Sequence, residues 1–226
     1  METNINTQDV GSKKPSLLGM ITSPGEQFER MKTKSPVWVA FILFILIGTV
    51  TTAAVFYLSV VNTPEVAKEI NGQDGQMIKW FALGGGALFG LFGTPIGLFI
   101  AAGFYKVIMM LMGNDTPYMK ILSIYLYANL VFYIGSLLNV GLGLIFDGNG
   151  TDTYTSLAPL FEKGTVLNGI ASSIEIFNIW SLILTGLGLH IVAGLSKKKA
   201  TILIVIFFIL TIGLGFLKGL GNSFGA

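Results

Sequence analysis

The sequence predicts an all-α integral membrane protein, a bundle of five transmembrane helices with a short N-terminal amphipathic interfacial helix. Hydrophobic residues make up 52% of the 226-residue chain and charged residues only 12%, about half the charged share of soluble domains. The apolar residues fall into five long runs separated by polar loops. The 29 glycines suit helices that approach one another closely in a membrane.

Composition also excludes several classes of function. The net charge of +2 is too small to indicate a nucleic-acid partner. The chain has no cysteine, which excludes disulfides, thiol catalysis and cysteine-ligated metals. The first 35 residues lack the apolar centre of a cleavable signal peptide, so the first membrane helix is expected to direct insertion. We expect a disordered cytoplasmic tail over 1–15, an amphipathic interfacial segment over 16–35 and a five-helix membrane domain over 36–226.

The interfacial segment begins with a helix-start pattern. Ser23 is suited to cap a helix whose first residue is Pro24, and Glu26 would complete a capping box. The helix would place Phe28 and Met31 on one side. The pattern fits an amphipathic helix on the cytoplasmic membrane surface or, equally, a solvated linker whose positive charges anchor the first span.

The first two spans differ in length. The first, 37–61, is 25 residues long without a charge, which is ample for a bilayer that needs about 20 helical residues. The second, 81–112, is apolar except for Lys106 and would reach about 48 Å, beyond a hydrocarbon core of roughly 30 Å. A tilted or kinked helix follows, with Pro95 as the kink. Two shorter spans are the alternative, but no polar hairpin divides the run.

The remaining spans are separated by clear polar loops. The third, 119–145, is entered through the turn-forming residues 113–117. A loop over 146–167 follows. The fourth span covers 173–195 and the fifth 201–220, with a run of three lysines between them. Five spans place the two termini on opposite sides of the membrane.

Orientation follows from the cationic residues, because these are retained on the cytoplasmic side. The N-terminal side receives ten of them: Lys13, Lys14, Arg30, Lys32, Lys34, Lys106, Lys120, Lys197, Lys198 and Lys199. The other side receives four: Lys68, Lys79, Lys163 and Lys218. We therefore expect a multi-pass protein of the cytoplasmic membrane with its N-terminus in the cytoplasm and its C-terminus outside.

The second span carries a pattern of small residues. Four glycines share one narrow helix face: Gly86, Gly90, Gly93 and Gly97. Such a face allows the backbone of another helix, within the protein or from a partner, to approach closely. A flexible gating helix is the functional alternative. Gly215 and Gly219 offer a similar contact in the fifth span.

Polar residues within the spans are the other candidates, since ionisable groups inside a membrane are often functional. Lys106 is expected to extend to the lipid headgroups, with a substrate or ion role as the alternative. Tyr125, Asn129 and Tyr133 share one face of the third span, which suits interhelical hydrogen bonds or a polar ligand pocket. His190 is the only histidine and is expected to bond a neighbouring helix. Glu175 is expected at the outer end of the fourth span, within reach of water.

No catalytic constellation accompanies these residues. The sequence has no serine, histidine and acid set, no HExxH, no paired carboxylates within the spans and no phosphate-binding loop. We therefore expect no enzyme, no cofactor and no metal site.

Two stretches resemble a known family. Residues 21–32 read ITSPGEQFERMK, and residues 177–184 read FNIWSLIL and are followed by Gly186 and Gly188. Both are similar to bacterial Yip-domain proteins, relatives of eukaryotic Ypt/Rab-interacting proteins, and the resemblance covers about 16–220. The DLYGP segment of the eukaryotic members is absent, so GTPase binding is not carried over.

The resemblance to a Gram-positive member implies an accessory protein that interacts with, and helps to assemble, a multicomponent ABC-type exporter protecting against a secreted toxic peptide. The expected partners are thus membrane lipid and other membrane proteins, with exporter subunits foremost and a homo-oligomer left open. A non-enzymatic scaffold or assembly factor is the leading hypothesis. A small-solute or ion permease using the polar face of the third span is the second, and a lipid-interacting role for the segment before the first span is the third.

Overall fold

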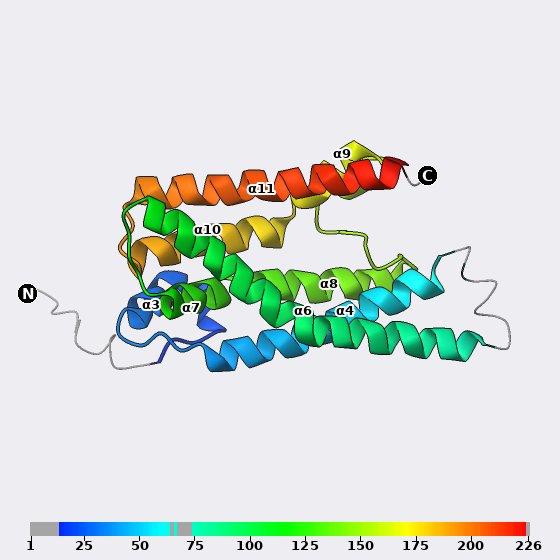
Figure 1. The fold of residues 1–226 in the computed structure, drawn as a ribbon, viewed down its shortest axis with the longest axis horizontal. Helices are drawn as coiled ribbons and strands as arrows, with labels where there is room; N and C mark the ends of the chain where they lie inside the picture. Colours follow the sequence, from blue (N-terminus) through cyan, green and yellow to red (C-terminus); the bar gives the residue numbers. More distant parts are fainter. Residues whose placement is uncertain (1–13, 64–65, 67–73, 225–226) are drawn as a thin grey trace, which may run out of the picture.

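The computed structural model describes residues 14–63, 66 and 74–224, which fold into helices (Figure 1). Most of the expected tail over 1–15 lies outside the described residues. Along the chain the helices are α2 (Gly19–Thr22), α3 (Pro24–Met31), α4 (Trp38–Val61), α6 (Gly75–Leu111), α7 (Tyr118–Ala128), α8 (Leu130–Ile145), the 3-10 turn η1 (Ala158–Leu160), α9 (Val166–Ser173), α10 (Ile176–Ile191) and α11 (Lys197–Phe224).

Three of the described helices, α4, α6 and α11, are long and apolar enough to cross a membrane, and α7 with α8 makes a fourth if the bent pair is one span. The fourth expected span, 173–195, is represented by α10, which has only 16 residues. At 1.5 Å per residue α10 is about 24 Å long, shorter than a hydrocarbon core of roughly 30 Å. Helix length alone therefore supports three or four spans.

The third expected span is broken at Asn129, where α7 and α8 meet at 41°. Asn129 ends α7 and precedes α8, and its Nδ2 donates to the carbonyl oxygen of Tyr125 at 2.8 Å. A short polar side chain that bonds its own backbone competes with regular helix bonding. The third expected span, 119–145, is therefore formed by two helices that meet at a bend.

The second expected span is a single continuous helix of 37 residues that contains Pro95 and begins before residue 81, at Gly75. It changes direction part-way along its length (Figure 1). Its first part lies along α4, and its second part runs across the bundle and ends beside the start of α11 (Figure 1). The overlong apolar run is thus accommodated by a bend and by a helical extension before it.

The loop expected after the third span contains structure that the sequence did not indicate. The last two residues of the expected loop, 166 and 167, begin α9, which lies beside α11 (Figure 1). Thr165 caps α9, because its Oγ1 accepts from the backbone N–H of Asn168 at 3.1 Å.

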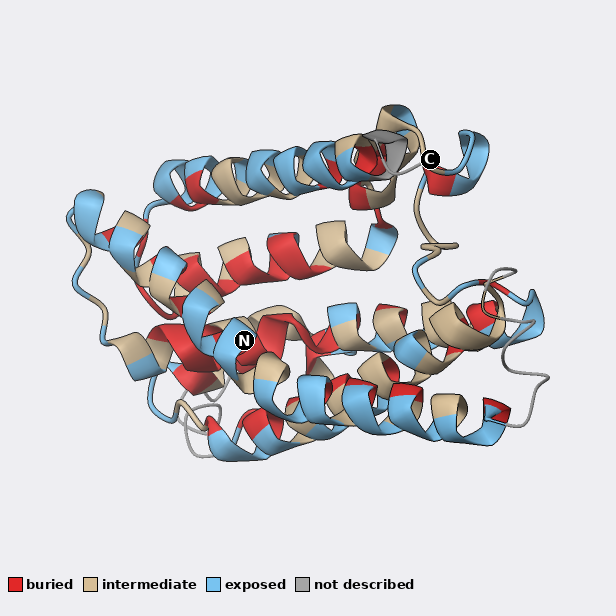
Figure 2. Ribbon diagram, turned by 45° about the vertical axis from the view of Figure 1, so that its right-hand side comes forward, coloured by how far each residue is buried: buried red, intermediate tan, exposed pale blue. Residues whose placement is uncertain are grey.

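The buried residues lie in the interior, while the long helices expose apolar outer faces (Figure 2). The core is densest near the end that holds α3 and α7, where the largest fully buried side chains include Phe28, Phe44, Leu126 and Leu189. Exposed apolar faces of this kind are stable against lipid rather than water.

Candidate functional site

The first two glycines of the α6 stripe pack against α4. A Cβ at Gly86 would lie 2.8 Å from Cα of Ala53, and one at Gly90 would lie 2.6 Å from Cα of Thr49. Real Cβ atoms do not approach backbone this closely. Only glycine therefore permits the observed contact between the two helices.

The other two glycines do not share this contact. A Cβ at Gly93 would meet only the ring of Phe89, at 3.5 Å, and no described atom outside the helix lies within 4 Å of one at Gly97. Beyond the bend, the buried face of α6 passes instead through Leu98, Ala102 and Tyr105. The stripe divides into a half used inside the protein and a half that faces outward.

The glycine pair of α11 is also used internally. A Cβ at Gly215 would lie 2.4 Å from the carbonyl oxygen of Gly169, and one at Gly219 would lie 2.7 Å from Cα of Val166. Both contacts are to α9. This pair seats α9 against α11, and it is not free for a partner helix.

Lys106 is bound within the chain. Its Nζ lies 2.8 Å from Oδ1 of Asp115 and donates to the carbonyl oxygen of Thr116 at 3.0 Å, and its side chain is 19% exposed. The hydrogen bond and charge of Lys106 lower the pKa of Asp115. The lysine thus ties α6 to the loop before α7, where a free extension to the headgroups was expected.

The remaining polar candidates do not converge on one pocket. Tyr133 stacks on Phe44 with ring centroids 4.4 Å apart, while Asn129 bonds its own helix. His190 Nδ1 lies 2.7 Å from the carbonyl oxygen of Leu195, so the ring closes the turn after α10. The bond observed for His190 is thus within its own turn, whereas the sequence predicted one to a neighbouring helix. A carbonyl only accepts, which places the proton on Nδ1.

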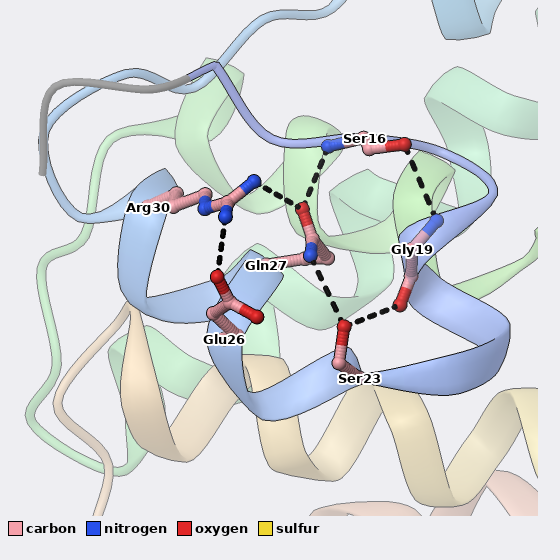
Figure 3. Close-up of polar contacts among 6 residues, drawn as sticks. All are labelled: Ser16, Gly19, Ser23, Glu26, Gln27 and Arg30. Atoms are coloured by element: carbon pink, nitrogen blue, oxygen red, sulfur yellow. Dashed lines mark hydrogen bonds and ion pairs between the residues drawn. The ribbon is translucent and has the colours of Figure 1, made fainter. Parts of the chain in front are cut away.

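The segment before α4 is held by a polar cluster (Figure 3). Gln27 Oε1 accepts from the backbone N–H of Ser16 at 2.8 Å, and Gln27 Nε2 donates to Ser23 Oγ at 3.3 Å. Glu26 forms an ion pair with Arg30. Ser23 makes no side-chain capping bond, so the expected capping box is not formed.

The apolar side of α3 faces the protein. Phe28 and Met31 are fully buried, and the ring of Phe28 lies against Gly188 of α10, where a Cβ would be only 2.6 Å away. A membrane-surface helix needs those side chains exposed to lipid. A helix begins at Pro24, but its apolar face is covered by the protein, so the structure does not support the expected position on the membrane surface.

The same end of the molecule is bonded together by its loops. Asn114 Nδ2 donates to the carbonyl of Ala193 at 2.8 Å, and Lys199 Nζ donates to the carbonyl of Met112 at 2.6 Å. These bonds join the turn after α6 to the turn before α11. At the lysine-rich end of the molecule, the turns between helices are thus packed and hydrogen-bonded to one another.

The opposite end holds two adjoining cavities, each of about 420 Å³. They share Thr151, Asp152, Thr153, Ser172 and Lys218. The first cavity is formed by the loop after α8 and by α9, and the second lies between α8 and α11.

A hydrogen-bond network lines the second cavity. Glu175 accepts from Thr155 Oγ1 and from the backbone N–H of Asn178, each at 2.6 Å. Asn139 Nδ2 donates to Thr155 Oγ1 at 2.7 Å. Glu175 is only 6% exposed, where the sequence predicted access to water.

Comparison with protein families assigns most of this helical chain to one model. The Yip1 domain model matches residues 18–218. The chain belongs to the Yip1 domain family. It is also 31% identical to membrane protein YknW of Bacillus subtilis (strain 168) over 227 aligned positions, covering 99% of this chain and 98% of the relative. A search of solved structures found no match.

The features of this Yip1 domain that sequence reasoning missed are α9 and the network around Glu175. Glu175 stood out as a polar residue near one end of a span, but Asn139 lies 36 positions before it along the chain. Their link is Thr155, an ordinary loop threonine. No sequence pattern distinguishes it from its neighbours.

Proposed function

We propose that this Yip1-family membrane protein is a non-enzymatic scaffold that interacts with a multicomponent ABC-type efflux transporter and helps to assemble it, giving protection against a toxic peptide. Membership of a family not known for enzymes supports this role. The similarity to YknW over nearly the whole chain supports it further, through the accessory role that the resemblance implies.

The observation that carries the proposal is the open face of α6. Only 17% of the residues in the most apolar part of this helix are buried within the protein. Gly97 is exposed there, and Phe92 and Ile96, in the turn and a half before it, are 62% and 57% exposed. Small residues between large apolar ones let a second helix backbone approach closely in a membrane.

The proposal includes five spans in the cytoplasmic membrane, with the N-terminus inside. The packed, lysine-rich end then lies in the cytoplasm, in agreement with the retention of positive charge on that side. The short α10 completes the fourth span with the buried residues that follow it, Val192, Ala193 and Leu195.

Co-purification from gently solubilised membranes tests the role. The tagged protein, expressed at its native level, should recover ATPase and permease subunits of an exporter. Gly97→Ile should reduce that recovery. Gly84→Ile is the matched control, since Gly84 is also exposed but lies on the opposite side of α6 from Gly93. Recovery of no transporter subunit, or equal recovery with both variants, would contradict the proposal.

A further inference from the structure

The cavity between α8 and α11 contains an unusual pair of charges. Glu175, which lines this cavity, is buried and lies within 4.0 Å of no cationic side chain among the described residues. Lys218, on its α11 wall, makes no ion pair with any described carboxylate. The other two charges around the paired cavities, Asp152 and Lys163, neutralise each other at 2.9 Å. Glu175 and Lys218 are thus an anion and a cation that have no ionic partner among the described residues.

The carboxylate of Glu175 also has unused acceptor capacity. Each of its oxygens accepts one hydrogen bond, from Thr155 or from Asn178. An ionised carboxylate has about four acceptor sites, so about two remain for a ligand. A buried charge is costly unless it is paired, and an ammonium group with N–H donors would supply both the charge and the bonds.

The lining of this cavity is polar on the side of the loop after α8 and apolar on the side of the long helices. Thr151 and Asp152 lie at the loop side, while Phe132, Val140 and Leu214 belong to the long apolar helices. Phe132 is 41% and Leu214 is 68% exposed. The apolar part of the cavity therefore opens onto the outer surface of the bundle, which faces lipid.

The helix packing leaves this side open. The main partners of α11 are α9 and α10, and those of α8 are α4 and α10. Figure 1 shows α11 with α9 on one side of this end of the molecule and α8 with α4 on the other. An amphipathic molecule could enter between α8 and α11 from the membrane.

We propose that this cavity binds the headgroup of a zwitterionic amino-phospholipid, phosphatidylethanolamine. Its primary ammonium donates to Glu175, its phosphate pairs with Lys218, and its acyl chains lie along Phe132, Val140 and Leu214. A primary ammonium fits the unused carboxylate sites better than the quaternary ammonium of phosphatidylcholine, which has no N–H donor. The role proposed above for α6 is not needed for this site.

Native mass spectrometry of the full-length, delipidated protein in detergent tests the site. Phosphatidylethanolamine, phosphatidylcholine and phosphatidylglycerol with the same acyl chains are the probes. The wild type should bind phosphatidylethanolamine most tightly, and Glu175→Gln and Lys218→Met should each weaken it about tenfold, as loss of a charge-assisted contact does. Glu162→Gln and Lys79→Met, which change charges outside the cavity, should have no effect.

Thermal unfolding without lipid identifies any variant that fails to fold. Because Lys218 is exposed, Lys218→Met should fold, and the lipid binding of this variant then decides the test. Binding of phosphatidylethanolamine by folded Lys218→Met or Glu175→Gln at the wild-type level would overturn the proposal. Equal wild-type affinity for phosphatidylglycerol would also overturn it. Free phosphoethanolamine that competes at concentrations equal to the lipid would show a soluble amine site and overturn the lipid assignment.

Discussion

The division of the α6 glycine stripe leads to opposite effects for the same substitution at two positions. Gly90→Ala adds a Cβ 2.6 Å from Cα of Thr49 and 2.8 Å from the carbonyl oxygen of Gly48. Both atoms belong to the α4 backbone, so the two helices must move apart. Gly97→Ala adds the same methyl group where no described atom outside the helix lies within 4 Å.

The expected magnitudes follow from these surroundings. Overpacking of a tight contact costs roughly 1–3 kcal/mol, whereas Gly→Ala inside an exposed helix gains about 0.5–1 kcal/mol. Because the gain in helix propensity is common to both variants, their free energies of unfolding should differ by about 1–3 kcal/mol, with Gly90→Ala below the wild type and Gly97→Ala at or above it.

Reversible unfolding in mixed micelles, followed by helix content, measures this difference. Gly86→Ala should behave like Gly90→Ala, and Gly93→Ala like Gly97→Ala. Equal effects at all four positions would refute the division of the stripe. A large loss at Gly97 alone would show that α4 follows the second half of α6.

The other predictions address topology, electrostatics and transport. Because the chain has no cysteine, single replacements are labelled cleanly: a membrane-impermeant maleimide should label Asn149→Cys in intact cells and Ser196→Cys only after permeabilisation, and the reverse pattern would contradict the proposed orientation. The lowered pKa of Asp115 beside Lys106 means that its contribution to stability is present above the ordinary aspartate pKa and is lost as the pH falls through the lowered value. Stability measured against pH should show this acid loss in the wild type and lack it in Asp115→Asn. Liposomes containing only this protein should show no solute flux, and a flux that Asn129→Leu abolishes would favour a permease instead.

Hydropathy predicted the helical membrane class because burial in lipid requires long apolar runs whatever the tertiary contacts are. The first run, 37–61, agrees with α4 to within one residue at its start. The predicted helix boundaries were wrong where a polar side chain bonds to the backbone of its own helix. The third run bends at Asn129, although the neighbours of this residue are apolar, and the side-chain amide of Asn129 donates to the carbonyl oxygen of Tyr125 there.

The contacts of each helix face were harder to predict than the position of the helix in the sequence. An ideal helix places Gly93 on the same face as Gly86, but the bend in α6 turns a different face towards the core after Pro95. The apolar side of α3 was visible in Phe28 and Met31, yet a sequence does not distinguish lipid from the groove beside Gly188. The error at α3 arises because membrane and protein interior are similarly apolar.

Photo-crosslinking from the open face of α6 tests the proposed scaffold role most directly. A photoreactive residue at Phe92 or Ile96, in cells expressing the protein at its native level, should form adducts with exporter subunits. The same residue at Ile183, which is 59% exposed on α10, should not. Adducts with lipid alone at both α6 positions, or equal protein adducts from α10, would contradict a partner surface on α6.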